Sequence, residues 1–314
     1  MNENSAILVR DLHRSFGDIE AVGGIDFEVK KGEILSLLGP NGAGKTTTIS
    51  IISCLLRPDG GDVQVLGTSI LDDPQAVKAF LGVVPQEIAV YEDLSARENL
   101  NFWGKMYGLR GNLLGERVEE VLEVTGLGDR QKDKVEKFSG GMKRRLNIGI
   151  ALLNKPEILI MDEPTVGIDP QSRRNILDRV KDFNREGTTI LYTTHYMEEA
   201  QELSDHIVIM DHGKLIAYGT HEELVKIVGE LDRIELTIDT DTDGLLEAWK
   251  TIPGVNQVTS EDGGMNLLVD DSNLVLPHLF EAATAKGVRV TSVEITEPNL
   301  EAVFLHLTGR ALRD

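Results

Sequence analysis

One segment of the chain reads Gly39-Pro40-Asn41-Gly42-Ala43-Gly44-Lys45-Thr46-Thr47. It follows a short apolar run, residues 34–38, that is typical of a fully buried strand, and it leads into residues 46–54, which have the apolar content of a helix. A strand, a glycine-rich turn and a helix are the context in which the pattern G-x-x-x-x-G-K-[ST] marks a phosphate-binding loop. The segment therefore predicts a site for a nucleoside triphosphate.

Each residue type in this loop has a physical reason to be there. Gly39, Gly42 and Gly44 allow a tight turn whose backbone N–H groups point inward, and the following helix adds its free N–H groups and positive dipole end. Lys45 is expected to reach the β- and γ-phosphates, and the Thr46 hydroxyl to bind Mg²⁺. The alternative is a glycine-rich turn with a chance Lys-Thr pair, which the flanking strand and helix disfavour.

The composition bounds the class of protein. The chain has 314 residues, of which 41% are apolar, so it can form one large α/β domain and a smaller one, or two comparable domains. Its net charge of −20 argues against nucleic acid as a partner, because phosphate backbones are bound by clustered Lys and Arg. The single cysteine, Cys54, excludes an intrachain disulfide. The sequence contains no run of about 18 apolar residues, so it predicts no membrane span. We expect a protein that is soluble or peripheral.

The pattern of apolar residues changes along the chain. Strands alternate with helices up to residue 229, and a helical insertion interrupts them at about residues 87–155. From residue 230 there are 16 acidic and 6 basic residues, and the order of elements becomes β-α-β-β-α-β. We expect an α/β nucleotide-binding domain over residues 1–229 and a small α+β domain of ferredoxin-like fold over residues 230–314.

Two further motifs are weaker when taken alone. Asp162 and Glu163 end an apolar run, which places one carboxylate to hold Mg²⁺ and the next to polarise a water for attack on the γ-phosphoryl group; a helix N-cap explains the pair nearly as well. In Ser139-Gly140-Gly141-Met142, the serine is a natural N-cap and the glycines permit close approach of a backbone or a phosphate. The basic run after it, residues 143–145, is expected on the exposed side of that helix.

These motifs, in this order, resemble the nucleotide-binding subunit of ATP-binding-cassette (ABC) transporters over residues 7–229. Matched to that family, residues 39–46 are the Walker A motif, residues 158–163 the Walker B motif and residues 139–141 the signature. Gln86 stands at the Q-loop, Asp169 at the D-loop and His195 at the switch histidine, and Phe16 falls where the family places an aromatic that stacks on adenine. The resemblance implies a P-loop ABC ATPase with a RecA-like core, an antiparallel β subdomain and a helical subdomain.

The resemblance also implies the roles of single residues in the Mg²⁺-dependent hydrolysis of ATP to ADP and phosphate. The residues implied to bind ATP are Phe16, Gly39, Pro40, Asn41, Gly42, Ala43, Gly44, Lys45, Thr46, Thr47 and Gln86. The implied catalytic groups are Lys45, Glu163 and His195, and the implied metal ligands are Thr46, Gln86 and Asp162. Two subunits would pack head to tail, so that Ser139, Gly140, Gly141 and Met142 of one act on the ATP bound by the other.

Several positions depart from the family pattern. Phe138 and Met142 stand where Leu and Gln are common, Phe16 stands where Tyr is commoner, and the D-loop reads Val166-Gly167-Ile168-Asp169 instead of Ser-Gly-Leu-Asp. None of these changes removes a charged catalytic group, so we expect hydrolysis to be kept.

The end of the chain narrows the resemblance. Residues 297–310 look like the C-terminal extension of the ABC-2-type exporter ATPases, a group that includes drug-resistance and sodium-extrusion ATPases. The resemblance implies a separately encoded membrane permease, a second ATPase subunit in a homo- or heterodimer, and a place at the cytoplasmic face of the membrane. Two alternatives stay open: a soluble ABC ATPase acting on ribosomes or DNA, and a nucleotide-gated binding module without turnover.

Overall fold

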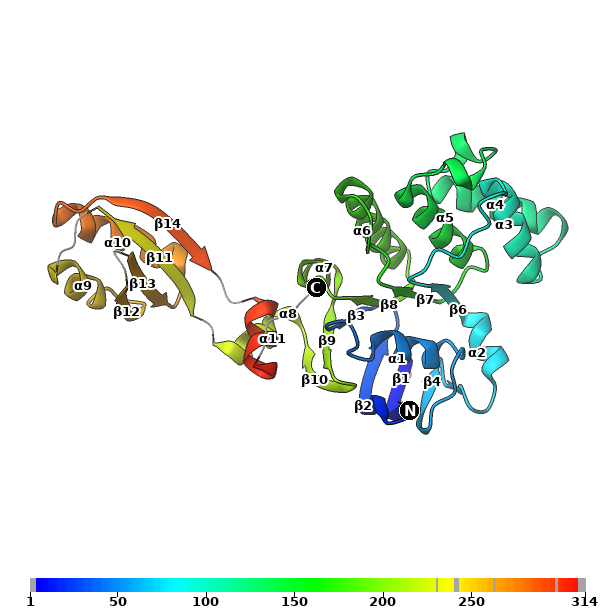
Figure 1. The fold of residues 1–314 in the computed structure, drawn as a ribbon, viewed down its shortest axis with the longest axis horizontal. Helices are drawn as coiled ribbons and strands as arrows, with labels where there is room; N and C mark the ends of the chain where they lie inside the picture. The colour runs from blue at the N-terminus through cyan, green and yellow to red at the C-terminus, as the bar shows by residue number, and fades with distance from the viewer. Residues whose placement is uncertain (1–3, 230, 240–242, 262–263, 297–298, 310–314) are drawn as a thin grey trace. The chain divides into compact units, whose positions relative to one another are not determined.

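The computed structural model describes residues 4–229, 231–239, 243–261, 264–296 and 299–309. Its contacts divide the chain into two compact units, one that ends at His221 and one that begins at Glu222. Each unit has its own hydrophobic core. The first contains two β-sheets and a group of helices, and the second contains one sheet with its own helices (Figure 1).

The centre of the first unit is a six-stranded sheet in the order β10-β9-β3-β8-β7-β6. Its strands are β3 (Ile34–Leu38), β6 (Leu81–Val84), β7 (Ile158–Asp162), β8 (Thr189–Thr194), β9 (His206–Asp211) and β10 (Lys214–Gly219). Neighbouring strands run parallel except β10, which pairs antiparallel with β9. Every residue of β3, β7 and β8 is buried, as their continuous apolar sequences predict for strands covered on both faces.

Helices pack on both faces of this sheet because alternate residues of a strand point to opposite sides. Leu35 and Leu37 of β3 lie in one core with α1 (Lys45–Ile52), whereas Ile34 lies in another with α6 (Pro170–Arg185) and α7 (Met197–Leu203). The carboxyl ends of β3, β7 and β8 meet at one edge, where Leu38 pairs with Thr194 and Asp162 with Thr193. That edge carries the predicted site.

A second, antiparallel sheet has the strand order β2-β1-β4-β5. Its strands are β1 (Ser5–Phe16), β2 (Ile19–Lys30), β4 (Gly60–Val65) and β5 (Thr68–Ser69), and α2 (Pro74–Phe80) follows them. β1 and β2 are longer than the apolar alternation predicts. The extra length takes the β1–β2 turn to the phosphate-binding loop, as described below.

The helical insertion contains α3 (Ala96–Met106), α4 (Gly111–Val124) and α5 (Gly140–Leu152), with short 3-10 turns η1 (Gly128–Arg130) and η2 (Val135–Lys137). α3 begins with a capping box, in which the Ser95 hydroxyl accepts from the Glu98 N–H and the Glu98 carboxylate accepts from the Ser95 N–H. Residues 85–95 form a loop, so the first helix of the insertion predicted at about residues 87–155 starts later than the insertion itself. Within the described ranges, no helix of the chain is both long and apolar enough to cross a bilayer.

The second unit contains the predicted β-α-β-β-α-β order. Its elements are β11 (Asp232–Ile238), α9 (Asp243–Lys250), β12 (Val255–Glu261), β13 (Gly264–Val269), α10 (Ser272–Ala285) and β14 (Val290–Thr296). The sheet order β12-β13-β11-β14, antiparallel throughout, is that of a ferredoxin-like fold. The buried Trp249 indole N–H donates to the Leu279 carbonyl over 3.0 Å and ties α9 to α10.

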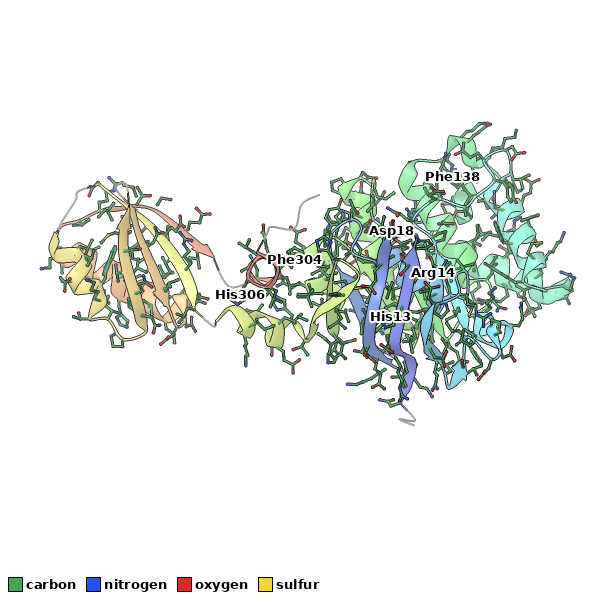
Figure 2. All side chains as sticks on the ribbon, turned by 60° about the horizontal axis from the view of Figure 1, so that its bottom comes forward. His13, Arg14, Asp18, Phe138, Phe304 and His306 are labelled. Atoms are coloured by element: carbon green, nitrogen blue, oxygen red, sulfur yellow. The ribbon has the colours of Figure 1, made fainter. Side chains whose placement is uncertain are left out.

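The two units meet between His221 and Glu222. The sequence predicts the boundary later, at residue 230. α8 (His221–Val225) and η3 (Lys226–Val228) precede β11, and the terminal helix α11 (Leu300–Thr308) contacts η3. α11 buries Leu300, Val303 and Phe304, of which Figure 2 labels Phe304. This packing between segments more than 70 residues apart groups residues 222–229 with the second unit. Residues 297–298 and 310 of the family-like C-terminal stretch lie outside the described residues.

Candidate functional site

The predicted phosphate-binding loop joins β3 to α1 as expected. α1 begins after Gly44, which has a left-handed backbone (φ 101°), and no side chain caps its first turn. A Cβ at Gly39 would lie 2.3 Å from the Met210 carbonyl oxygen, and one at Gly44 would lie 2.4 Å from that of Ala21. Glycine is therefore required at both positions by close backbone neighbours, and the N–H groups at the start of α1 stay available for an anion.

Lys45 lies inside this loop with only 4% of its side chain exposed. Its ammonium donates to the carbonyls of Gly39 (2.7 Å) and Pro40 (3.0 Å) and lies 3.1 Å from Glu163 Oε1. A buried ammonium needs such partners, because an unpaired charge in the interior is costly. The loop thus holds its cation at the point where phosphates would meet the end of β7.

Glu163 is the carboxylate on which the other polar groups converge. Beyond Lys45, its Oε2 accepts from Gln86 Nε2 (3.4 Å) and lies 3.2 Å from His195 Nδ1, although the orientation of that ring does not make a hydrogen bond. Its backbone is left-handed (φ 42°), and its N–H donates to the Thr193 hydroxyl (3.0 Å). A strained backbone of this kind persists where the surroundings fix it, and such positions cluster at active sites.

Asp162 and Thr46 form the part of the site that suits a cation. The Asp162 carboxylate accepts from the Thr193 hydroxyl (2.6 Å) and from the Thr46 hydroxyl (3.4 Å). Burial raises the pKa of Asp162, and the two hydroxyl donors offset part of that effect. Among the described residues no three His, Cys, Asp or Glu side chains cluster as metal ligands. The hydroxyl and carboxylate oxygens fit a hard cation that takes its remaining ligands from phosphates and water.

A pocket of 430 Å³ opens over the loop. It is lined by Phe16, Ile19, Glu20, Ala21, Asn41, Gly42, Ala43, Gly44, Lys45, Thr46, Thr47, Gln86, Glu163 and His212. Gly39, Pro40, Asp162 and His195 lie just behind this lining and contact Lys45, Thr46 or Glu163 directly. The structure therefore brings together the predicted ATP-binding, catalytic and metal-binding residues.

Phe16 stands at the rim of the pocket, with 48% of its surface exposed. The Arg14 guanidinium lies over its ring, 4.9 Å from the centroid, and is itself held by Asp59 at 2.7 Å. Figure 2 labels Arg14 on the same strand. An exposed, supported aromatic ring at this position can stack on a planar base.

The lining also contains residues that the motifs do not indicate. His212, an exposed residue of the β9–β10 turn that belongs to no motif, lines the pocket. The reason is that this turn packs on the loop: the Gly213 N–H donates to the Ala43 carbonyl (3.0 Å), and the Gly23 N–H donates to the Gly213 carbonyl (2.8 Å). Ile19, Glu20 and Ala21 reach the pocket because β2 begins beside it.

The signature residues and Asp169 do not line this pocket. Ser139 caps α5 by accepting from the Met142 N–H (3.3 Å), and Asp169 caps α6 by accepting from the Ser172 N–H (3.0 Å), which holds the pKa of Asp169 below its usual value. The two caps lie together, because a Cβ at Gly141 would come 2.1 Å from Ser172 Oγ. Within one chain these residues form a separate cluster.

Arg144 corrects one prediction. The basic run at residues 143–145 was expected on the exposed side of α5, but Arg144 is 2% exposed. Its guanidinium donates to the carbonyls of Pro85 (2.7 Å) and Gln86 (2.6 Å), and Asn147 of the same helix accepts from the Ala89 N–H (3.3 Å). α5 therefore fixes the loop that carries Gln86.

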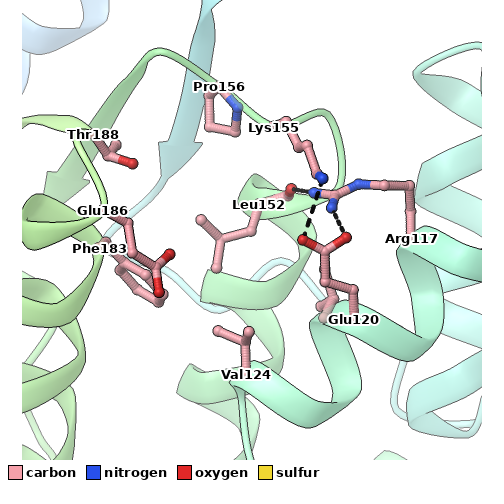
Figure 3. A pocket seen from close by; sticks show the side chains of 10 residues that line it. Arg117, Glu120, Val124, Leu152, Lys155, Pro156, Phe183, Glu186 and Thr188 are labelled. Atoms are coloured by element: carbon pink, nitrogen blue, oxygen red, sulfur yellow. Dashed lines mark hydrogen bonds and ion pairs between the residues drawn. The ribbon is translucent and has the colours of Figure 1, made fainter.

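A second pocket, of 260 Å³, lies where α4 meets the ends of α5 and α6 (Figure 3). Arg117 on α4 donates to the carbonyls of Leu152 (2.6 Å) and Leu153 (3.0 Å) and pairs with Glu120, which also lies 3.4 Å from Lys155. None of its lining residues belongs to the predicted motifs. Its charged groups satisfy the end of α5, so we assign it a structural role.

Comparison with known proteins agrees with this geometry. The ABC transporter family model matches residues 22–166, and a model of the C-terminal domain of DrrA1-3-like ATP-binding proteins matches residues 219–308. The linearmycin resistance ATP-binding protein LnrL of Bacillus subtilis is 50% identical over 97% of this chain and 98% of its own length. The daunorubicin resistance ATP-binding protein DrrA3 of Streptomyces coeruleorubidus is 37% identical over 98% and 96%.

A solved structure has the same cassette. It is a dimeric ATP-binding cassette in a post-hydrolysis state, bound to ADP and Pi, with a TM-score of 0.62 and 26% identity over 68% of this chain and 98% of that one. The C-terminal match also confirms the subgroup predicted from the end of the sequence. The chain therefore belongs to the ATP-binding subunits of ABC transporters and is an ATPase.

Proposed function

We propose that Glu163, Lys45 and His195 carry the hydrolytic step. The observation behind this proposal is the convergence of Lys45 Nζ, Gln86 Nε2 and His195 Nδ1 on one buried carboxylate, at 3.1, 3.4 and 3.2 Å. A carboxylate held among donors at the end of a strand can orient a water and accept its proton during in-line attack. Lys45 would stabilise charge on the transferred phosphoryl group, since its ammonium is already fixed inside the loop.

The nucleotide is expected to lie along the pocket, with its base on Phe16 and its phosphates on the first turn of α1. Thr46 and Asp162 would hold Mg²⁺, with Gln86 beside them. When bound, Mg²⁺ supplies neutralisation of phosphate charge. The chain's own groups keep the water and the proton in place: Glu163 as acceptor, and His195 at its other oxygen.

We propose that the working unit is a dimer in which Ser139, Gly140, Gly141 and Met142 complete the site of the other subunit. In one chain these residues lie away from the pocket, with Asp169 beside them, which is what an arrangement in trans requires. The start of α5 would offer its N–H groups to the γ-phosphate of the partner's ATP. Homo- and heterodimers satisfy this requirement equally.

We propose further that the dimer powers a separate membrane permease that exports a drug, and that it binds the cytoplasmic face of the membrane through that permease. The relatives LnrL and DrrA3 are described as resistance proteins for linearmycin and daunorubicin. Full-length similarity to both supports a drug as the cargo of the coupled permease.

The permease is expected to dock on the aromatic surface of the helical insertion, made by Tyr91, Phe102, Trp103 and Tyr107. Tyr91 and Phe102 meet edge to face at 5.0 Å and are 45% and 38% exposed. The Trp103 ring joins this aromatic group, with its centroid 6.4 Å from that of Tyr91, 5.6 Å from that of Phe102 and 6.4 Å from that of Tyr107. This surface directly follows the Gln86 loop, which suits a link between nucleotide and permease.

The hydrolytic assignment is tested by Glu163→Gln. We expect ATP turnover to fall by at least about 100-fold, with nucleotide binding kept. Glu157→Gln, an exposed carboxylate just before the start of β7, is the matched control and should keep parental turnover. Unchanged hydrolysis in Glu163→Gln would remove the assignment and favour a module that binds without turnover.

Dimerisation is tested in the same background. Light scattering should show that Glu163→Gln becomes a dimer on addition of ATP and that Glu163→Gln with Gly140→Asp does not, because the added carboxylate repels the γ-phosphate. ATP-dependent dimers of the double variant would exclude the signature from the interface.

The permease is identified by pull-down of Glu163→Gln with Mg-ATP from detergent-solubilised membranes. We expect one polytopic membrane protein in near-stoichiometric amount. Tyr91→Ala should lose it, whereas Leu113→Ala, which removes another exposed apolar side chain of the helical insertion, should retain it. Recovery of ribosomal proteins would instead support the soluble ATPase class.

A further inference from the structure

A second buried carboxylate lies behind the catalytic edge. Glu199 of α7 is 1% exposed and accepts four hydrogen bonds. Its Oε1 accepts from the Thr165 hydroxyl (2.6 Å) and from Arg173 Nε (2.7 Å). Its Oε2 accepts from the Tyr192 hydroxyl and the Thr194 hydroxyl, each at 2.9 Å. A carboxylate in the interior is tolerated only with such full satisfaction, so all four donors are fixed by one group.

The four donors belong to three segments that carry predicted site residues. Thr165 lies two residues after Glu163, and Thr194 directly precedes His195. Arg173 lies in the first turns of α6, the helix that Asp169 caps. Glu199 therefore joins the loop after β7, the end of β8 and the start of α6 through its two oxygens.

A second set of contacts runs from this carboxylate to the His195 ring. The Arg173 guanidinium lies 4.3 Å from the centroid of the Tyr196 ring, whose own centroid lies 4.2 Å from that of His195. The Tyr196 N–H donates to the Thr194 hydroxyl at 2.9 Å. The imidazole thus contacts Tyr196, which is itself held by two groups that Glu199 binds, Arg173 and Thr194.

We propose that Glu199 is a positioning residue for ATP hydrolysis, which sets the approach of His195 to Glu163 by fixing the segments on either side of them. This inference rests on the proposed roles of Glu163 and His195. Glu199 does not line the nucleotide pocket, so it touches neither phosphate nor water there. It acts through Thr165, Thr194 and Arg173.

The reasons for expecting a catalytic effect are geometric. Glu163 has a left-handed backbone that only its surroundings maintain, and Thr165 anchors the turn that follows it. A displacement of about 1 Å at reacting groups can lower a rate by about 100-fold. Nucleotide binding depends instead on the loop between β3 and α1, to which Glu199 makes no hydrogen bond or ion pair within the described residues. The effect should therefore appear in kcat and not in KM.

The test compares neighbouring carboxylates of one helix in the full chain. Glu199→Gln preserves the size of the side chain but replaces one acceptor oxygen with an NH₂ that must face two donors. We expect kcat for ATP to fall by about tenfold or more, with KM and the dissociation constant of ATP within about twofold of the parent. Glu198→Gln is the control, because that side chain is 87% exposed and lies 3.5 Å from the same Arg173. It should leave kcat unchanged.

Single-donor variants keep the proposal testable if Glu199→Gln does not fold. Thr165→Val removes the donor on the catalytic loop and should lower kcat at unchanged KM, whereas Tyr192→Phe removes a donor within β8 and should lower the melting temperature with kcat kept. Parental kcat in folded Glu199→Gln or Thr165→Val overturns the proposal, and so does an equal loss in ATP affinity. Failure of the underlying function is distinct, since Glu163→Gln would then retain hydrolysis.

Discussion

Two helices of the first unit have glycines at or next to their first residue, yet their first turns differ. α1 starts after Gly44 without any side-chain cap, and its first residues line the nucleotide pocket. α5 starts after Ser139, whose hydroxyl already accepts from the Met142 N–H, and its Gly141 is pressed against Ser172 of α6. Gly39 and Gly44 before α1 let neighbouring backbone approach the loop and leave the first N–H groups of the helix free, whereas Gly141 of α5 makes room for a neighbouring helix.

This difference distinguishes two requirements for binding phosphate at a helix start: space for the ligand, and backbone N–H groups that are free to donate. The motifs alone do not distinguish them. At the start of α1 the nucleotide pocket and the free N–H groups occur together, so one chain supplies the complete binding site for phosphates. At α5, Gly140 is exposed and a Cβ there would meet only Ile168 Cδ1, at 3.8 Å. The start of α5 is therefore open at Gly140 and closed at Gly141, which is consistent with a contact made by another chain.

The largest expected effect comes from removing the cation at the start of α1. Lys45→Ala removes the ammonium from the loop and leaves Glu163 without its cation. ATP turnover should fall by at least about 100-fold, and a fluorescent ATP analogue should bind more weakly. The measurement is steady-state hydrolysis together with a binding titration.

The control for Lys45→Ala is a lysine in the early part of α5. Lys143 pairs with Glu92 at the surface of the helical insertion, and such pairs contribute about 0–1 kcal/mol. Lys143→Ala should keep turnover within about twofold of the parent. Equal losses in both variants would show that hydrolysis responds to net charge and not to the position of the cation.

The phosphate-binding loop and the start of α1 were predictable from sequence, because the residues that form them are neighbours in the chain. The run 34–47 contains its strand, its glycines and its helix start, and parallel strands place Asp162 and Glu163 at the same edge. The burial of Arg144, the contact between Gly141 and Ser172, and the position of His212 depend on segments far apart in sequence. The same is true of residues 222–229, which a terminal helix draws into the second unit.

The second prediction separates the two glycines of α5. In Gly141→Ala the new Cβ would come 2.1 Å from Ser172 Oγ, so α5 or α6 must shift, and the free energy of unfolding should fall by about 1–3 kcal/mol. Gly140→Ala meets ordinary contacts and should change it by less than about 0.5 kcal/mol. Denaturant melts measure both. Equal stability of the two variants would mean that Gly141 is not a packing glycine.

The smallest effects concern the caps beside these glycines, and pH distinguishes them. Hydrogen bonds from Ser172 hold the folded-state pKa of Asp169 below 3.8, so this group stabilises the fold above its unfolded pKa and loses that contribution as pH falls through the lowered value. Asp169→Asn keeps a capping oxygen but removes the charge. Its melting temperature should therefore lie below the parent's at pH 6, and the difference should shrink as pH falls through the lowered pKa of Asp169.

Ser139→Ala is the control for that titration, because a hydroxyl carries no charge over this range. Loss of the cap should lower the free energy of unfolding by about 1 kcal/mol at every pH. If the deficit of Asp169→Asn stays constant as pH falls through the lowered pKa of Asp169, the aspartate acts as a neutral cap like Ser139. A deficit that shrinks instead would show that the start of α6 is stabilised by charge, whereas the start of α5 keeps its N–H groups for a neutral cap and, in the proposed dimer, for phosphate.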